Sequence, residues 1–94
     1  MPGVVTVRLF HRLRELVARK TVSISPVPGS VVELVTRFIE SYPEAGDEML
    51  DDNGELSHRY VVAINENLVK RADWDGVKLN DGDEVAFLTM LSGG

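Results

Sequence analysis

The segment Leu91-Ser92-Gly93-Gly94 has the residue types of a tail whose own carboxylate reacts. Gly93 and Gly94 have no Cβ, so they can adopt nearly any backbone conformation and let the main chain approach another surface closely. Four extended residues reach about 13 Å, which is enough to enter a narrow channel in a partner. On Gly94 no side chain shields the carboxyl carbon from a nucleophile or from a phosphate of ATP. The pattern therefore predicts chemistry on the C-terminus itself.

An ordinary frayed end is the plain alternative, because chain termini are usually disordered and without a role. At an average glycine usage near 7%, about one chain in 200 ends in two glycines by chance. The glycine pair is therefore uncommon without being diagnostic, so the rest of the chain has to distinguish a reactive tail from a frayed end.

The other polar residues offer little chemistry of their own. Without cysteine there is no thiolate nucleophile and no zinc–sulfur site, so any sulfur that the protein handles comes from elsewhere. His11 and His58 stand apart from any triad or metal-ligand spacing and are expected at the surface or at strand edges. Asp81 and Asp83 fit a turn better than an acid–base pair. We expect no metal, and no calcium loop in the acidic 44–55 stretch.

Length, composition and charge indicate which class of protein this is. The chain has 94 residues, 44% of them hydrophobic, and a net charge of −5. These values predict one small globular domain that does not bind nucleic acid. The sequence shows neither a signal peptide nor a membrane-spanning apolar run, so a soluble cytoplasmic protein is expected. A basic segment, 8–20, and an acidic one, 44–55, could steer docking of a partner, although solvated faces explain most such charge runs.

The elements that position the tail follow from hydrophobic periodicity. Strands are predicted at 4–10, 21–25, 60–65, 68–69 and 84–90, with a helical turn at 11–19. One longer helix begins at Ser30, where a capping box predicts that Glu33 reaches back to the Ser30 amide, and stops at Pro43. Its apolar stripe should face the core and comprises Val31, Leu34, Val35, Phe38 and Tyr42. The 44–56 stretch is predicted as a solvated loop or short helix, and Trp74 as a residue at the edge of the core.

This order of elements predicts an α+β fold in which one main helix packs across a mixed sheet. If the first and last strands are both central, they lie side by side and the tail leaves the middle of the sheet. That arrangement is the β-grasp, or ubiquitin-like, roll. We therefore expect a β-grasp domain at 1–90 and a reactive C-terminal tail at 91–94.

With this order and tail, the chain resembles the MoaD/ThiS family of ubiquitin-like sulfur carriers. Four pieces carry the resemblance: Phe10 with Arg14-Glu15-Leu16-Val17, the 62–69 hairpin, the turn and strand at 79–87, and Gly93-Gly94. Length and the helical 11–19 segment favour the MoaD branch, the small subunit of molybdopterin synthase. The acidic 44–55 region is longer than is usual there, and Thr89-Met90-Leu91 replaces a segment that often contains proline.

The resemblance implies a definite chemistry at Gly94. A MoeB-like activating enzyme uses ATP to adenylate the terminal carboxylate, and a sulfur donor then displaces AMP to leave a thiocarboxylate. The tail enters a larger MoaE-like subunit and delivers sulfur for the molybdenum cofactor. No cofactor is bound permanently, and the chain is a carrier subunit without catalytic residues beyond Gly93 and Gly94. Partner contacts are expected from Phe87, Met90, Leu91 and Ser92, although Phe87 fits the core equally well.

Other functions use the same activated tail. The chain could be a modifier joined through Gly94 to lysines of other proteins, or a sulfur carrier for thiamine or for thiolated tRNA. It could also be a β-grasp interaction domain with an inert tail. The sequence ranks the carrier subunit of molybdopterin synthase first and the inert tail last.

Overall fold

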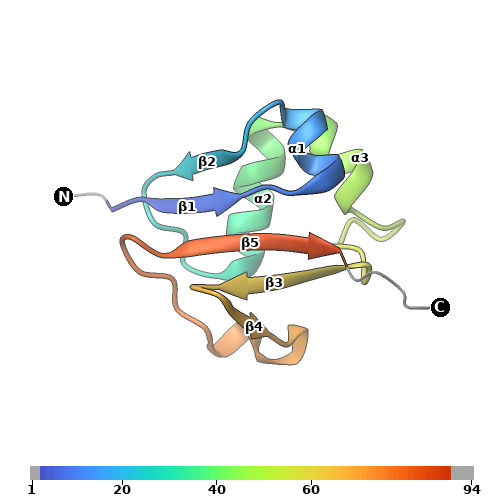
Figure 1. Cartoon of the computed structure of the whole chain (residues 1–94). Coiled ribbons are helices and arrows are strands. Elements are labelled where there is room, and N and C mark those ends of the chain that lie inside the picture. Colours follow the sequence, from blue (N-terminus) through green and yellow to red (C-terminus); the bar gives the residue numbers. More distant parts are fainter. Residues whose placement is uncertain (1–2, 90–94) are drawn as a thin grey trace.

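The structure is a computed structural model that describes residues 3–89 (Figure 1). The strands are β1 (Val5–Arg8), β2 (Thr21–Ile24), β3 (Tyr60–Ile64), β4 (Asn67–Val69) and β5 (Glu84–Thr89). The helices are α1 (His11–Val17), α2 (Val31–Ser41), α3 (Pro43–Met49) and a short 3₁₀ helix, η1 (Arg71–Gly76). The predicted strands and the main helix are thus confirmed. Within residues 3–89 we find no helix that is long and apolar enough to cross a membrane.

The five strands form one mixed sheet in the order β2-β1-β5-β3-β4. β1 and β5 run parallel at its centre, with Thr6 opposite Glu84 and Arg8 opposite Ala86. The other neighbouring strands are antiparallel. This topology confirms the prediction of a β-grasp fold with the first and last strands side by side.

The core lies between α2 and one face of the sheet (Figure 1). Val31, Leu34 and Phe38 of α2 are fully buried, and the Phe38 ring lies 5.8 Å from that of Phe87 in β5. The predicted stripe therefore does face the core, with Tyr42 only partly buried at its end. Such an apolar stripe fixes the helix on the sheet, because its burial is the main gain in free energy.

The N-terminus of α2 departs from the predicted capping box by one residue. The Ser30 hydroxyl accepts the Glu33 amide N–H at 3.1 Å, as expected. The Glu33 carboxylate, however, accepts the amide N–H of Gly29 and not that of Ser30. It also lies 3.4 Å from the Arg37 guanidinium one turn further on. Both side chains still satisfy free amides at the helix start, which is what stabilises a cap.

Pro43 ends α2 and at once begins α3. Proline is favoured in the first turn of a helix because its missing N–H would have no partner there. The acidic stretch is therefore a short helix followed by a loop. In that loop the Asp51 carboxylate accepts the amide N–H groups of Asn53 and Glu55 at 2.9 and 3.0 Å. These bonds, led by the one from Glu55, hold the pKa of Asp51 below its usual value.

The turn that leads into β5 is built from its own acidic residues. Asp83 accepts the amide N–H of Asn80 at 2.8 Å, and Asp81 accepts that of Val4 at 2.9 Å. Asp81 thus holds the turn beside the start of β1 and Asp83 closes the turn itself, which confirms the prediction that they form a turn.

Candidate functional site

The carboxyl end of β5 is the base of the predicted reactive tail. β5 lies at the centre of the sheet, paired with β1 on one side and β3 on the other. Its last residue, Thr89, lies opposite Tyr60 of β3. The predicted tail residues Met90, Leu91, Ser92, Gly93 and Gly94 lie outside the described residues. The described part of the chain therefore supplies a fixed base: residues 87–89 pair with β3, and β5 as a whole cannot shift without also breaking its pairing with β1 at residues 84–86.

A polar cluster around Tyr60 ties the elements at this end of the sheet together. Tyr60 is 4% exposed, and its hydroxyl donates to the Glu48 carboxylate at 3.2 Å. The same carboxylate accepts a hydrogen bond from Arg59 at 2.8 Å and lies 4.0 Å from Arg12 of α1. Burial, followed by the nearby negative charge of Glu48, raises the pKa of Tyr60 to about 12.

The raised pKa of Tyr60 makes the stability of the protein depend on alkaline pH. In the unfolded chain a tyrosine ionises near pH 10, whereas folded Tyr60 keeps its proton until about pH 12. Tyr60 therefore contributes fully below about pH 10, and this contribution is lost as the pH rises through about 12. We expect the free energy of unfolding to fall less steeply with pH in Tyr60→Phe than in the wild type, measured by urea unfolding. Tyr42→Phe is the matched control, and equal slopes in wild type and Tyr60→Phe would contradict this assignment.

The face of the sheet opposite α2 carries a hollow built by strand register. One row crosses all five strands and comprises Thr21, Arg8, Ala86, Ala63 and Leu68. Ala86 and Ala63 have small side chains, so the surface of the sheet is depressed at the centre of the row. Together with Phe10 and Leu88, side chains of this row line a hollow of about 510 Å³. We call this surface the open-face patch: Arg8, Phe10, Ala63, Leu68, Ala86 and Leu88.

The open-face patch has the chemistry of a protein-binding surface. Leu68 is 71% exposed, although it is a large apolar residue. The Arg8 guanidinium lies 5.5 Å from the centre of the Phe10 ring and 3.8 Å from the Glu84 carboxylate. Apolar side chains beside a charged rim are typical of protein–protein interfaces.

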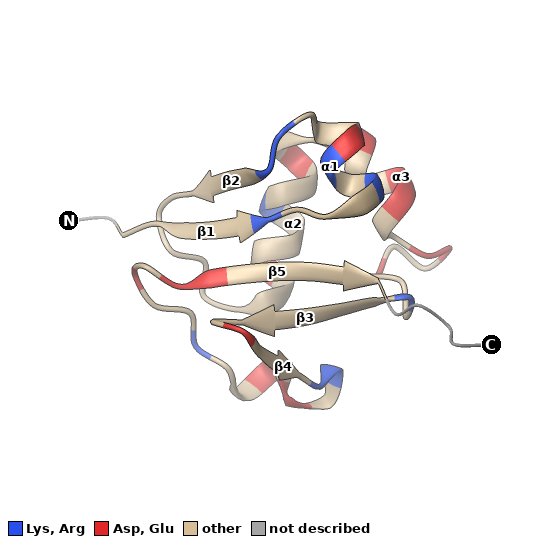
Figure 2. Ribbon diagram, viewed as in Figure 1, with Lys and Arg blue, Asp and Glu red and all other residues tan. Residues whose placement is uncertain are grey.

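The basic and acidic segments of the sequence meet at one end of the molecule. Figure 2 shows the cationic positions of α1 close to the acidic positions of α3. Arg12 lies between Glu15, at 3.6 Å, and Glu48, at 4.0 Å. One ion pair, between Arg12 and Glu48, therefore joins the two segments. His11 and His58 are exposed, as predicted.

Comparison with known proteins decides the family. The sequence model of the ThiS family matches residues 7–94, a range that includes Gly93 and Gly94. The chain belongs to the ThiS family. No protein with a curated description matches this ThiS-family chain at a significant level.

Solved structures confirm the ubiquitin-like fold of the ThiS-family chain. It is similar to small archaeal modifier protein 1 (SAMP1) from Haloferax volcanii, with 25% identity and a TM-score of 0.82 over 98% of this chain and 100% of that one. A putative molybdopterin converting factor subunit 1 from Pyrococcus furiosus has 24% identity and a TM-score of 0.71, and the match covers 95% of this chain and 99% of that one. CysO in a BexX/CysO complex from Amycolatopsis orientalis has 21% identity and a TM-score of 0.73, and the match covers 96% of this chain and 99% of that one. The last two likenesses show the fold alone.

Phe87 of the ThiS-family chain lies in the core, which is one of the two positions that the sequence leaves open for it. It is 1% exposed and packs against Phe38 beneath α2, so its side chain does not reach the surface. Side chains alternate along a strand, so Val85 and Phe87 face the core while Ala86 and Leu88 face outward. Sequence reasoning overlooked Phe10, Leu68 and Leu88 as candidate contacts. For Leu88 the alternation with Phe87 was visible in the sequence, but it did not show which of the two faces points outward.

Proposed function

We propose that this protein carries sulfur as a thiocarboxylate on Gly94 and donates it as the small subunit of a molybdopterin synthase. The observation that carries the proposal is the ThiS-family match through Gly93-Gly94, five residues beyond the central strand end at Thr89. The length of the chain and its helical 11–19 segment favour this pathway, and a putative molybdopterin converting factor subunit 1 has the same fold. The protein works in the cytoplasm, where ATP is available to the activating enzyme.

The chemistry has two steps, and both involve the terminal carboxyl group of Gly94. A free carboxylate is a poor acyl donor, so a MoeB-like enzyme first activates it: a carboxylate oxygen attacks the α-phosphate of ATP and pyrophosphate leaves. A sulfide-equivalent donor then attacks the carbonyl carbon, the bond to AMP breaks, and sulfur remains on Gly94. A side chain on Gly94 would hinder both attacks.

The described residues act in docking and positioning. The open-face patch receives the activating enzyme and then the larger MoaE-like subunit, and the central β5 fixes the direction in which the tail leaves. Correct placement matters because an error of about 1 Å at a reacting centre can lower a rate about 100-fold. The groups that move protons during sulfur transfer belong to the larger subunit.

A second candidate is a protein modifier, and it is favoured by the similarity to SAMP1 over nearly the whole chain. In that case a lysine amine of a target protein attacks the same acyl-adenylate and forms an isopeptide bond. A sulfur carrier for thiamine or for thiolated tRNA would use the same thiocarboxylate with another acceptor.

The intact mass of the protein, purified from the cells that make it without reductant or acid, tests the proposal. We expect a fraction that is heavier by one oxygen-to-sulfur exchange, with the change mapped to Gly94. Chains joined to lysines, together with an unmodified free form, would instead establish the modifier. A protein found only in its free, unmodified form, with neither the exchange nor lysine conjugates while molybdenum cofactor is being made, would contradict both functions.

A further inference from the structure

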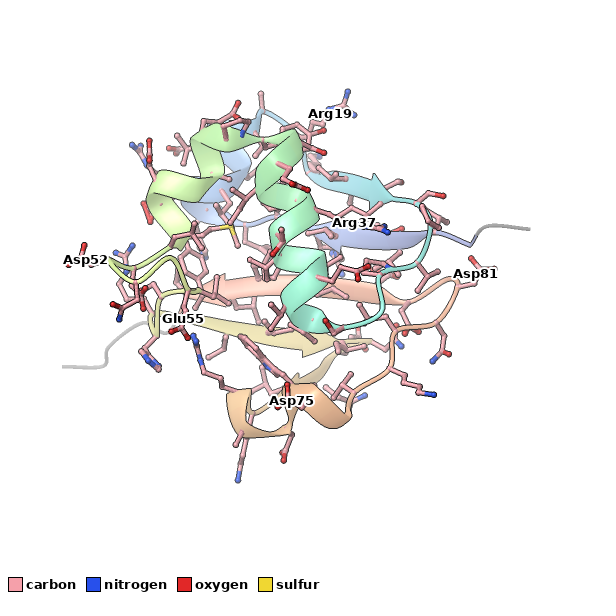
Figure 3. All side chains as sticks on the ribbon, turned by 180° about the vertical axis from the view of Figure 1, so that it is seen from behind. Arg19, Arg37, Asp52, Glu55, Asp75 and Asp81 are labelled. Carbon is pink, nitrogen blue, oxygen red and sulfur yellow. The ribbon has the colours of Figure 1, made fainter. Side chains whose placement is uncertain are left out.

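A second hollow lies on the opposite side of the molecule from the open-face patch. It is an open groove between the exposed side of α2, the Leu50–Leu56 loop and η1, with a volume of about 450 Å³. Known small-ligand and side-chain sites span about 300–1,000 Å³, so the groove is large enough for one or two apolar side chains. In Figure 3 the labelled Glu55 and Asp75 lie beside and below α2, on the two elements that flank it. We call this surface the back groove.

The floor of the back groove is apolar. Val35 and Trp74 are buried there, with exposures of 6% and 7%, and Leu56 is 4% exposed. Val32 stands at the edge and is 56% exposed, next only to Leu68 among the large apolar residues of the described chain. Val32 thus lines the back groove, and Leu68 lines the hollow of the open-face patch. Exposed apolar groups that gather at a depression mark interaction sites more often than scattered ones do.

The walls of the back groove are fixed by hydrogen bonds. Arg71 donates to the carbonyl oxygens of Leu56 and Ser57, and its guanidinium lies 4.8 Å from the centre of the Trp74 ring. The indole N–H of Trp74 donates to the Val69 carbonyl at 3.3 Å. The Asp51 carboxylate closes the loop on the other side through its bond to the Glu55 amide. A groove held in this way loses little conformational entropy when it is filled.

The rim of the back groove is acidic. Glu40, Glu55 and Asp75 line it, and all three are exposed. None of the three takes part in an ion pair with another residue of the 3–89 range. The one cation in the lining, Arg71, is held against the protein by the contacts described above. The rim therefore repels anionic membranes and nucleic acids, and it favours cationic partners.

We propose that the back groove binds a segment of a partner protein in which an apolar side chain is flanked by lysine or arginine. The apolar side chain enters between Val32 and Trp74, and the flanking cations pair with Glu55 and Asp75. This interaction does not use the Gly94 carboxyl, so it goes beyond the proposed function. It would let a partner hold the protein while the open-face patch and the tail remain free.

Synthetic peptides test this proposal directly, because Trp74 is the only tryptophan of the chain and reports on the groove. The probe is a short peptide with one Leu between two Lys residues, and its control is the same peptide with Glu in place of Lys. We expect the Lys peptide to change the Trp74 fluorescence with saturation and to bind more weakly as salt is added. No saturable change with the Lys peptide, or equal binding of the Glu peptide, would overturn the proposal.

Variants locate the bound peptide. Val32→Arg and Glu55→Lys should each lower the affinity about tenfold or more, with an unchanged melting temperature because both residues are exposed. Leu68→Ala in the open-face patch is the matched control and should bind as the wild type does. A chain that lacks Gly94 should also bind normally, so failure of the tail chemistry and failure of this site are distinguishable. Loss of binding in Leu68→Ala, with normal binding in Val32→Arg, would place the peptide on the other face and overturn the assignment.

Discussion

Removal of Gly94 is expected to abolish the oxygen-to-sulfur exchange while the stability of the domain stays the same. The deletion moves the reactive carboxyl back by one residue, about 3.3–3.6 Å along an extended chain. Because about 1 Å of misplacement can lower a rate about 100-fold, a loss of at least that size is expected. The described core ends at Phe87, so deletion of Gly94 removes none of its contacts. The measurements are the modified fraction, by intact mass, and the urea midpoint.

Gly94→Ala is the matched control for this deletion. It keeps the length of the tail and adds only a methyl group beside the carboxyl carbon, so its loss should be smaller than that of the deletion. Undiminished exchange in the deleted chain would show that the C-terminal carboxyl of Gly94 is not the group that carries sulfur. A lower urea midpoint would show that the tail also contributes to folding.

Most of the fold could be predicted from the sequence because its periodicities are strong. The β-branched alternation of β1 and β2 and the apolar stripe of α2 each identify one element and one buried face. The Ser30 cap and Pro43 mark the two ends of α2. Pairing of β1 with β5, which are nearly eighty residues apart, came from the order of elements and the family resemblance.

α3 was harder to predict because two of its three buried residues are small. Ala45 and Gly46 are buried beside Met49, and neither of the two contributes a strong apolar signal. Gly46 is required by close packing: a Cβ at this position would lie 2.9 Å from the Ile39 side chain of α2. Glycine lowers helix propensity, so the residue that lets the two helices approach also hides the second one in the sequence.

The candidate site was only partly predictable for a related reason. Both faces of β5 carry apolar residues: Val85 and Phe87 lie on one face, and Ala86 and Leu88 lie on the other. One face is core and the other belongs to the open-face patch, and the sequence alone does not say which is which. The back groove could not be predicted at all, because its lining comes from three segments that only the fold brings together.

Phe87 and Leu68 should respond to truncation in opposite ways, which separates the core from the open-face patch. Phe87→Ala removes a ring that is 1% exposed and packed on Phe38, and it should cost about 3–5 kcal/mol of unfolding free energy. A domain of this size has only about 5–14 kcal/mol in total, so the urea midpoint should fall steeply. Phe87→Leu leaves a smaller void, so its urea midpoint should lie between those of Phe87→Ala and the wild type.

Leu68→Ala should change the free energy of unfolding by less than about 0.5 kcal/mol, because Leu68 is 71% exposed. Its effect should lie in docking: the fraction of protein that carries sulfur on Gly94 should fall in the cells that make it. The Phe87 variants lower that fraction only in proportion to the chains that unfold. If Leu68→Ala instead lowered stability and left the sulfur-bearing fraction unchanged, the open-face patch would not be the surface that receives the activating enzyme.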